Sequence, residues 1–338
     1  MKNTSSNILK RIVGTLILPV LMYLVMLWLC RANGKNFFGT WTMWRSLIAD
    51  IGLSVACAMG IGLQFRCGRF DFSGGSIMLL AAIVAGNLAK AAGNSPLILA
   101  LACIGICVVC SLLVGLVYVL GRMPIVIVTI GMTLLFEAVT CLVYKGGGIN
   151  LVSNSKLKIF SSYPAVLIPA LLAVGVYAFY AYFTSTGNRA TLLANNQQAA
   201  VNIGVRENRN VIISYVYSGI LFGLATMIYC STAKLSGAFN SLQTVGSLFN
   251  NILPVFIGIT LAKACGDTLG IVVGALSLSL MDFGLEAVYT AELGNALSLM
   301  IVGVFLLVFN FIAGQGDLFH KIGTALTARH GKNFATNP

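Results

Sequence analysis

Residues 97–119 have the sequence LILALACIGICVVCSLLVGLVYV, a run without a single charged side chain. A helix that crosses the hydrocarbon core of a bilayer needs about 20 such residues. Because lipid offers the backbone no hydrogen-bond partners, a segment of this kind crosses the bilayer as a helix. This stretch therefore predicts an all-α membrane protein, and similar stretches recur along the chain.

The composition of the whole chain agrees with this prediction. Of the 338 residues, 58% are hydrophobic and only 9% are charged, and the mean hydropathy is +0.92. A soluble domain carries about 25% charged residues to keep its surface wetted. The composition excludes a soluble enzyme, a disordered protein and a secreted disulfide scaffold. The net charge of +12 comes from single basic residues and pairs between apolar runs. This pattern is typical of charges that flank a lipid bilayer, so we expect no nucleic-acid partner.

The apolar runs predict about ten spans in a single transmembrane domain over residues 1–338. We interpret the first run as a retained span, because no small-residue cleavage site follows it. With ten spans both termini lie on one side, and placing them in the cytoplasm puts 13 basic residues inside and 8 outside. The predicted spans are 12–30, 47–65, 76–92, 97–119, 125–144, 164–183, 211–233, 244–262, 268–290 and 295–313.

Two polar segments are unlike ordinary loops. Residues 184–210 form the longest polar interruption between spans, and their alanines and Gly204 predict a short helix to which another backbone can pack closely. Such a helix would dock a cytoplasmic partner, whereas the alternative is a solvated connector. Residues 68–76, GRFDFSGGS, break two apolar runs with glycine. Asp71 or Ser73 can cap a helix that starts near Ser76. The break either lines a transport path or lies at the membrane surface.

Three carboxylates fall within predicted spans, where a charge is costly unless it faces a bundle interior or a watery cavity. They are Glu137, Asp282 and Glu286, and the last two share one helix face because they are four residues apart. Together with Asp71 and Ser73, these residues are the candidates for a translocation path. They also support a different hypothesis, a secondary transporter that moves protons on these carboxylates.

Several catalytic and binding motifs are absent from the sequence. No G-x-x-x-x-G-K-[ST] loop occurs, so any ATP must be bound by a partner, and the chain itself needs no cofactor. No nucleophile–histidine or H-E-x-x-H arrangement supports an enzyme. Cysteines such as Cys57, Cys103, Cys107, Cys110 and Cys141 lie in apolar runs without histidine or acidic neighbours. We therefore interpret them as small buried hydrophobes, with no metal site.

Four segments, in order, give the sequence a family resemblance. Residues 69–76 (RFDFSGGS) are similar to a Gly-Ile-Asp-Leu-Ser-x-Gly-Ser motif, and 124–131 (PIVIVTIG) to Pro-Phe-Ile-x-Thr-Leu-Gly. Residues 194–205 (ANNQQAAVNIGV) resemble a cytoplasmic Gly-Gly-Asn-x-x-Ala-Ala-x-x-x-Gly-Ile motif, and 282–285 (DFGL) an Asn-Asn-Gly-Leu stretch. Over roughly 45–313 the chain resembles the ribose/galactoside-type permease subunits of bacterial ABC importers.

The resemblance implies a type II importer-like permease in the bacterial cytoplasmic membrane, with a cytoplasmic tail over 314–338. Such a permease works with a second permease chain, a separate ABC ATPase and an extracytoplasmic sugar-binding protein, and it carries a sugar or a similar small polar solute. Asn196, Ala199, Ala200 and Gly204 are then the residues of the ATPase-coupling helix. The family's glycine-rich turn before the ninth span is eroded in residues 262–267, so the second permease chain is either a copy of this chain or a different permease that keeps the fuller motifs.

Overall fold

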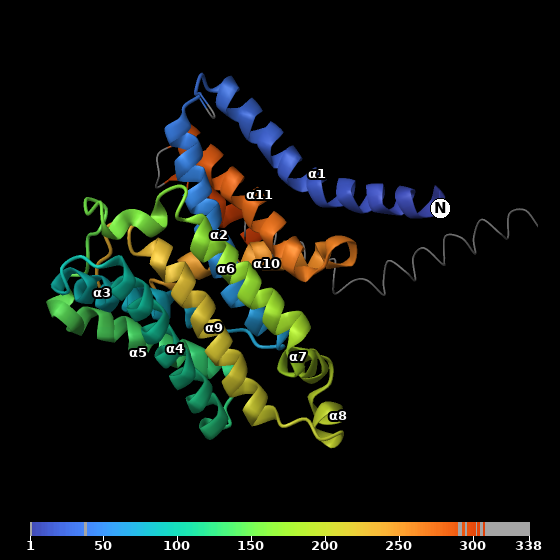
Figure 1. The fold of residues 1–338 in the computed structure, drawn as a ribbon, viewed down its shortest axis with the longest axis vertical. Helices are drawn as coiled ribbons and strands as arrows, with labels where there is room; N and C mark the ends of the chain where they lie inside the picture. Colours follow the sequence, from blue (N-terminus) through green and yellow to red (C-terminus); the bar gives the residue numbers. More distant parts are fainter. Residues whose placement is uncertain are drawn as a thin grey trace, which may run out of the picture.

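The computed structural model describes residues 2–36, 39–289, 293–294, 296–301, 303–304 and 307. These residues form a bundle of helices and contain no β-sheet (Figure 1). The helices are α1 (Lys2–Ala32), α2 (Trp41–Arg66), α3 (Gly74–Ala91), α4 (Pro96–Gly121), α5 (Ile125–Leu142), η1 (Val143–Gly146), η2 (Leu157–Ser161), α6 (Leu167–Ala178), the π-helical turn η3 (Phe179–Phe183), α7 (Ser185–Asn195), α8 (Gln197–Asn202), α9 (Glu207–Tyr229), α10 (Val245–Cys265) and α11 (Asp267–Val288).

The predicted helical membrane bundle is confirmed in the described part of the chain. Eight of its helices are long and apolar enough to cross a membrane. A ninth is counted if Leu167–Phe183 and the bent continuation Ser185–Asn195 form one span, with 73° between them. Nine predicted spans therefore coincide with helices of the structure. The tenth, 295–313, lies largely outside the described residues, and the tail 314–338 lies wholly outside them.

Close backbone contact holds the centre of the bundle together. On α9, Gly219 and Gly223 are four residues apart and face α4, so that a Cβ atom on either glycine would lie 2.6 Å from the backbone of α4. Small residues at this spacing let two membrane helices approach closely, and dispersion and packing then stabilise the pair where no hydrophobic effect operates. Helices α10 and α11 are also packed along each other, and α1 lies against α11.

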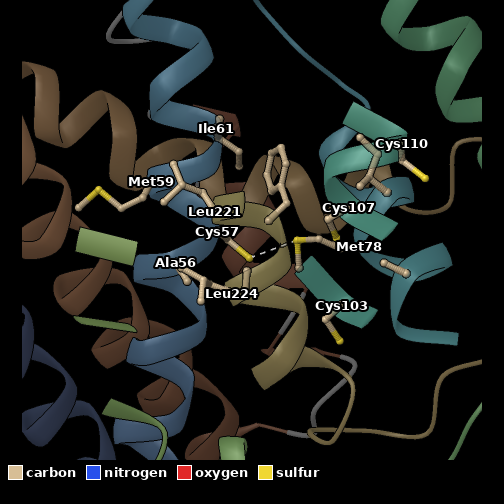
Figure 2. Close-up of a cluster of buried hydrophobic side chains, with 14 of the residues drawn as sticks. Ala56, Cys57, Met59, Ile61, Met78, Cys103, Cys107, Cys110, Leu221 and Leu224 are labelled. Atoms are coloured by element: carbon tan, nitrogen blue, oxygen red, sulfur yellow. Dashed lines mark hydrogen bonds between the residues drawn. The ribbon is translucent and has the colours of Figure 1, made fainter. Parts of the chain in front are cut away.

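The core lies between α2, α3, α4 and α9 and is rich in sulfur (Figure 2). The Cys57 thiol of α2 lies 3.6 Å from the Met78 sulfur of α3, and Leu221 and Leu224 of α9 pack nearby. The cysteines are free thiols, and the sequence prediction of buried hydrophobes is confirmed for Cys57, Cys103, Cys107 and Cys110, whereas Cys141 is partly exposed.

Candidate translocation site and coupling segment

The segment between α2 and α3 is extended and buried. Its Asp71 carboxylate is 5% exposed and accepts hydrogen bonds from the Ser73 backbone N–H at 2.8 Å and from the Ser73 hydroxyl at 2.6 Å. This turn starts α3 at Gly74, two residues before the predicted position. Asp71 therefore shapes the start of α3 from a position buried inside the protein, and whether the break lines a path or lies at the membrane surface stays a prediction.

Arg69 fixes this extended segment to two neighbouring helices. Its guanidinium donates to the Gln64 side-chain oxygen of α2 at 3.1 Å and to the Ser214 hydroxyl of α9 at 2.5 Å. It also lies 5.7 Å from the centre of the Tyr215 ring. A charge this deeply buried needs such partners, because desolvation is costly. The segment is thus a rigid part of the bundle and not a surface loop.

A second break precedes α10, and Glu137 holds it in place. The Glu137 carboxylate, from α5, is 2% exposed. It accepts hydrogen bonds from the backbone N–H groups of Leu242 and Thr244 at 2.7 and 2.8 Å, and from the Thr244 hydroxyl at 2.7 Å. An acidic group is favoured at this position, because the N-terminus of a helix carries unpaired N–H groups and a partial positive charge.

The two breaks meet inside the molecule. A Cβ atom on Gly75, in the first turn of α3, would lie 2.6 Å from the Thr244 carbonyl oxygen just before α10. Only glycine permits this contact. The N-termini of α3 and α10 are therefore neighbours inside the bundle.

A cavity of about 120 Å³ lies beside this junction. Its polar groups come from Ser247 and Asn251 of α10 and from Tyr229 of α9, and the rest of its wall is mostly apolar. Asp71, Ser73 and Glu137 are not among the residues that line the cavity, so their role in the path remains a prediction. The lining residues are Leu53, Cys57, Ile61, Gly74, Gly75, Met78, Phe222, Tyr229, Ser247, Leu248 and Asn251.

The other two candidate carboxylates lie near the C-terminal end of α11. Asp282 accepts a hydrogen bond from the Ser298 hydroxyl at 2.5 Å, and Glu286 is exposed one turn later. Their charges interact with that of Asp50 in α2, which the sequence did not single out. The structure therefore groups Asp282 and Glu286 with Asp50, and it gives Glu137 a separate set of partners.

The polar segment 184–210 contains two helices beyond the ends of α6 and α9 (Figure 1). The Asn196 side chain caps α8, accepting a hydrogen bond from the Ala199 backbone N–H at 3.0 Å. Ala200 is buried, whereas Ala199 is exposed. Gly204 follows α8 with φ +92°, a left-handed conformation that suits glycine. The segment is a folded element that presents a short capped helix at its tip.

A polar cluster anchors the base of this segment. Arg66, at the end of α2, forms an ion pair with Asp267, the first residue of α11, and donates to the Ala181 carbonyl oxygen at 3.2 Å. The Tyr182 hydroxyl donates to the same carboxylate at 2.5 Å. Tyr182 belongs to η3, which ends two residues before α7. The cluster thus connects α2 and α11 directly to the root of α7, and sequence reasoning missed it because its members are far apart in the chain.

Comparison with known proteins places this geometry in a family. Residues 44–309 match the family model described as the permease component of branched-chain amino acid transport systems. The chain belongs to this family. The match confirms the importer permease predicted from the motifs, and the proton-coupled alternative receives no support from it.

Known relatives of the permease are similar over most of their length. The fructose import permease protein FruG of Bifidobacterium longum is 25% identical over 86% of this chain and 89% of its own. The ribose import permease protein RbsC of Escherichia coli K12 is 25% identical over 78% of this chain and 83% of its own. The autoinducer 2 import system permease protein LsrC of Yersinia pseudotuberculosis is 25% identical over 80% of this chain and 76% of its own.

A solved structure shares the fold of the permease. It is a chain of an ABC transporter assigned to the metal-chelate type, in an inward-facing conformation. It aligns with a TM-score of 0.54 over 90% of this chain and 99% of its own, at 16% sequence identity. The chain therefore shares its helical fold with a chain of that transporter.

Proposed function

We propose that the permease carries a sugar or a similar small polar solute across the bacterial cytoplasmic membrane as part of an ABC importer. The observation that carries this proposal is the junction at Gly75 and Thr244, where two helices start inside the bundle beside a cavity. Helix starts inside a membrane bundle are typical of solute paths in transport proteins, although here the Asp71 and Glu137 carboxylates accept hydrogen bonds from N–H groups just before the two helices. The relatives with names that specify fructose, ribose and autoinducer 2 import support this class of solute.

The solute's passage requires an energy source that the chain lacks. We propose that a separate ABC ATPase docks on α8, with Asn196, Ala199, Ala200 and Gly204 as the coupling residues. Closure of the ATPase would move this rigid element, and the Arg66–Asp267 ion pair would pass the displacement to α2 and α11. Rigid-body transmission of this kind needs packed elements that move as a unit.

The permease would work with two further partners, a second permease chain and an extracytoplasmic solute-binding protein. We infer that both termini lie in the cytoplasm, as the distribution of basic residues predicts, and this orientation would put α7 and α8 on the ATP-containing side. The same orientation turns the outer ends of α2 and α11 toward the binding protein. Asp71, Ser73, Glu137, Asp282 and Glu286 remain candidates for the path, and the cavity residues Ser247 and Asn251 join them.

Affinity isolation of the tagged chain from its native membranes, followed by mass spectrometry, tests the assembly. We expect an ABC ATPase to be recovered with the chain. A second, different permease would establish a heterodimer, and recovery of the ATPase without another permease would favour a homodimer despite the eroded turn at 262–267. Recovery of the folded chain without any ATPase in several mild detergents would contradict the proposal.

A further inference from the structure

An apolar groove of about 560 Å³ runs along the surface between α6 and α9. Leu171, Leu172 and Gly175 form its wall on α6, and Tyr217 and Ile220 form its wall on α9. The groove is open to the outside of the bundle and lies away from the cavity described above. Its floor contains no charged side chain, so it suits a hydrocarbon chain.

A second pocket, of about 350 Å³, continues the same face of α9 toward the root of α7. Arg209, Ile213, Tyr217 and Ile220 recur at helical spacing, so they form one stripe along α9, and Arg206 immediately precedes the helix. Ile213 lines the second pocket, and Tyr217, one turn further on, lines the first. The two hollows therefore lie end to end, one apolar and the other polar.

The polar pocket carries an excess of positive charge. Arg189 of α7 lines it together with Arg206 and Arg209, and these arginines make no ion pair with any residue that the structure describes. Ser185 and Thr186, in the first turn of α7, complete the wall with a helix N-terminus that favours an anion. Guanidinium groups gathered in this way are suited to phosphate, which they bind through paired hydrogen bonds.

One buried polar atom in this pocket lacks a partner. Asn210 is 3% exposed, and its side-chain amide donates to the Thr186 carbonyl oxygen at 2.8 Å. Its Oδ1 atom accepts no hydrogen bond from the described residues. An acceptor left alone in a buried position costs free energy unless a ligand or water donates to it. The pocket thus suits a phosphate that has a hydroxyl group nearby.

The dimensions agree with a lipid. From Arg209 to Ile220 the stripe on α9 is roughly 16 Å long at 1.5 Å per residue, which matches about half of the 30 Å hydrocarbon core, or one leaflet. Phe179 and Phe183 are exposed and stacked with their ring centres 6.2 Å apart, at the level where the groove meets the polar pocket. Tyr182 between them is also exposed, and the amphipathic rings of tyrosine are typical of the headgroup level of a membrane.

We propose that this composite groove binds an anionic phospholipid, with the phosphate at Arg189, Arg206 and Arg209, a headgroup hydroxyl at Asn210, and one acyl chain between α6 and α9. Phosphatidylglycerol has this chemistry. The bound lipid would fill the gap between α6 and α9 and hold the root of the α7–α8 segment at a fixed depth in the membrane.

Native mass spectrometry of the full-length chain, titrated with phosphatidylglycerol or phosphatidylcholine of the same chain length, tests the proposal. We expect phosphatidylglycerol to bind about tenfold more tightly, because charged headgroup contacts are worth this much. Replacing the three arginines by glutamine should abolish the preference. Arg122→Gln, an exposed arginine at the end of α4, is the matched control and should retain it.

The tail contact is tested separately. Gly175→Leu fills the apolar groove, where a Cβ atom meets nothing within 4 Å, and should weaken binding of the intact lipid. Gly131→Leu, an equally open glycine on α5, is its control. If the arginine variant does not elute as a folded chain, the comparison of Gly175→Leu with Gly131→Leu still tests whether the lipid binds in the groove.

Three results would overturn the proposal. The first is equal binding of both lipids by the native chain. The second is displacement of the lipid by inorganic phosphate or glycerol phosphate at equal concentration, which would show a site for a soluble phosphate. The third is an arginine variant that retains phosphatidylglycerol but loses the ATPase, which would show that the arginines belong to a protein interface.

Discussion

At the scale of single residues, the Glu137 carboxylate is the anchor of the α10 start. It accepts three hydrogen bonds from Leu242 and Thr244 and is almost completely buried. Glu137→Ala leaves two backbone N–H groups without partners, so we expect the free energy of unfolding to fall by about 3 kcal/mol. The free energy of unfolding of Glu137→Gln should lie between those of Glu137→Ala and the native chain, because the amide keeps one acceptor oxygen. Thermal unfolding of the purified chain measures both.

Glu286→Gln is the control for this prediction. Glu286 lies in a predicted span as Glu137 does, but it is exposed and near a helix end. Its replacement should leave the unfolding temperature within error of the native value. An equal loss of stability in the Glu137 and Glu286 variants would show that Glu137 has no special anchoring role.

Gly75 is the second decisive residue, because it permits the contact between α3 and α10. Gly75→Ala places a methyl group against the Thr244 carbonyl oxygen, and backbone cannot rotate away as a side chain can. We expect destabilisation of about 1–3 kcal/mol, together with loss of solute uptake at equal expression. Gly105→Ala on α4, where nothing lies within 4 Å, should be neutral in both assays. Normal uptake by the Gly75→Ala variant would show that the α3–α10 junction is not part of the transport path.

Sequence reasoning predicted that Glu137 faces the bundle interior or a watery cavity, because a charge within a span is costly elsewhere, and it left two positions open for Asp71. It could not identify their partners. Glu137 meets Thr244 across 107 positions of the chain, and Arg69 meets Ser214 across 145. Such pairs depend on how helices are arranged, and the local pattern of residues contains no information on that arrangement.

At the scale of elements, the ion pair of Arg66 and Asp267 joins α2 and α11 beside η3. Asp267→Asn removes the charge and keeps the size of the side chain. We expect the ATPase to remain bound, because α8 is untouched, while solute-dependent ATP hydrolysis falls about tenfold. The measurement compares co-purified ATPase with hydrolysis by the same preparation. Tyr182→Phe, which removes one hydrogen bond to Asp267, should have a smaller effect in the same direction. Full hydrolysis by the Asp267 variant would exclude this link from coupling.

Helix α8 is the element through which we expect the ATPase to dock. Ala199→Arg places a long cation on its exposed face without disturbing Ala200, which is buried. Recovery of the ATPase with the tagged chain should fall about tenfold, because loss of one central contact is enough to weaken an interface this much. Asn208→Arg, exposed at the start of α9, is the control. Equal recovery with both variants would place the docking surface elsewhere.

Helices could be predicted well from the sequence where a single rule, an uninterrupted apolar run, determines them. Uninterrupted apolar runs located nine spans, and α4 follows the run 97–119 almost to the residue. The starts of α3 and α10 were harder, because glycine and charge break the pattern without showing which way the chain turns. The sequence indicated one short helix in 184–210, whereas the structure has two, α7 and α8, separated by a bend at Asn196.

At the scale of the whole molecule, membrane residence was the firmest prediction, because a chain with 9% charged residues cannot cover a water-facing surface. Its role as a permease follows from the family match over residues 44–309. The solute is beyond what the residues determine. The cavity at the α3–α10 junction is small and mostly apolar, so its lining offers few polar groups by which a particular solute could be recognised.

Uptake by reconstituted vesicles tests the central claim that the chain is the membrane part of an ATP-driven importer. Vesicles would contain the chain with its co-purified ATPase, ATP inside, and the binding protein loaded with radiolabelled solute outside. We predict uptake that stops when ATP or the ATPase is left out and that continues when an ionophore dissipates the proton gradient. Uptake by the chain alone, driven by a proton gradient and lost with the ionophore, would contradict the account.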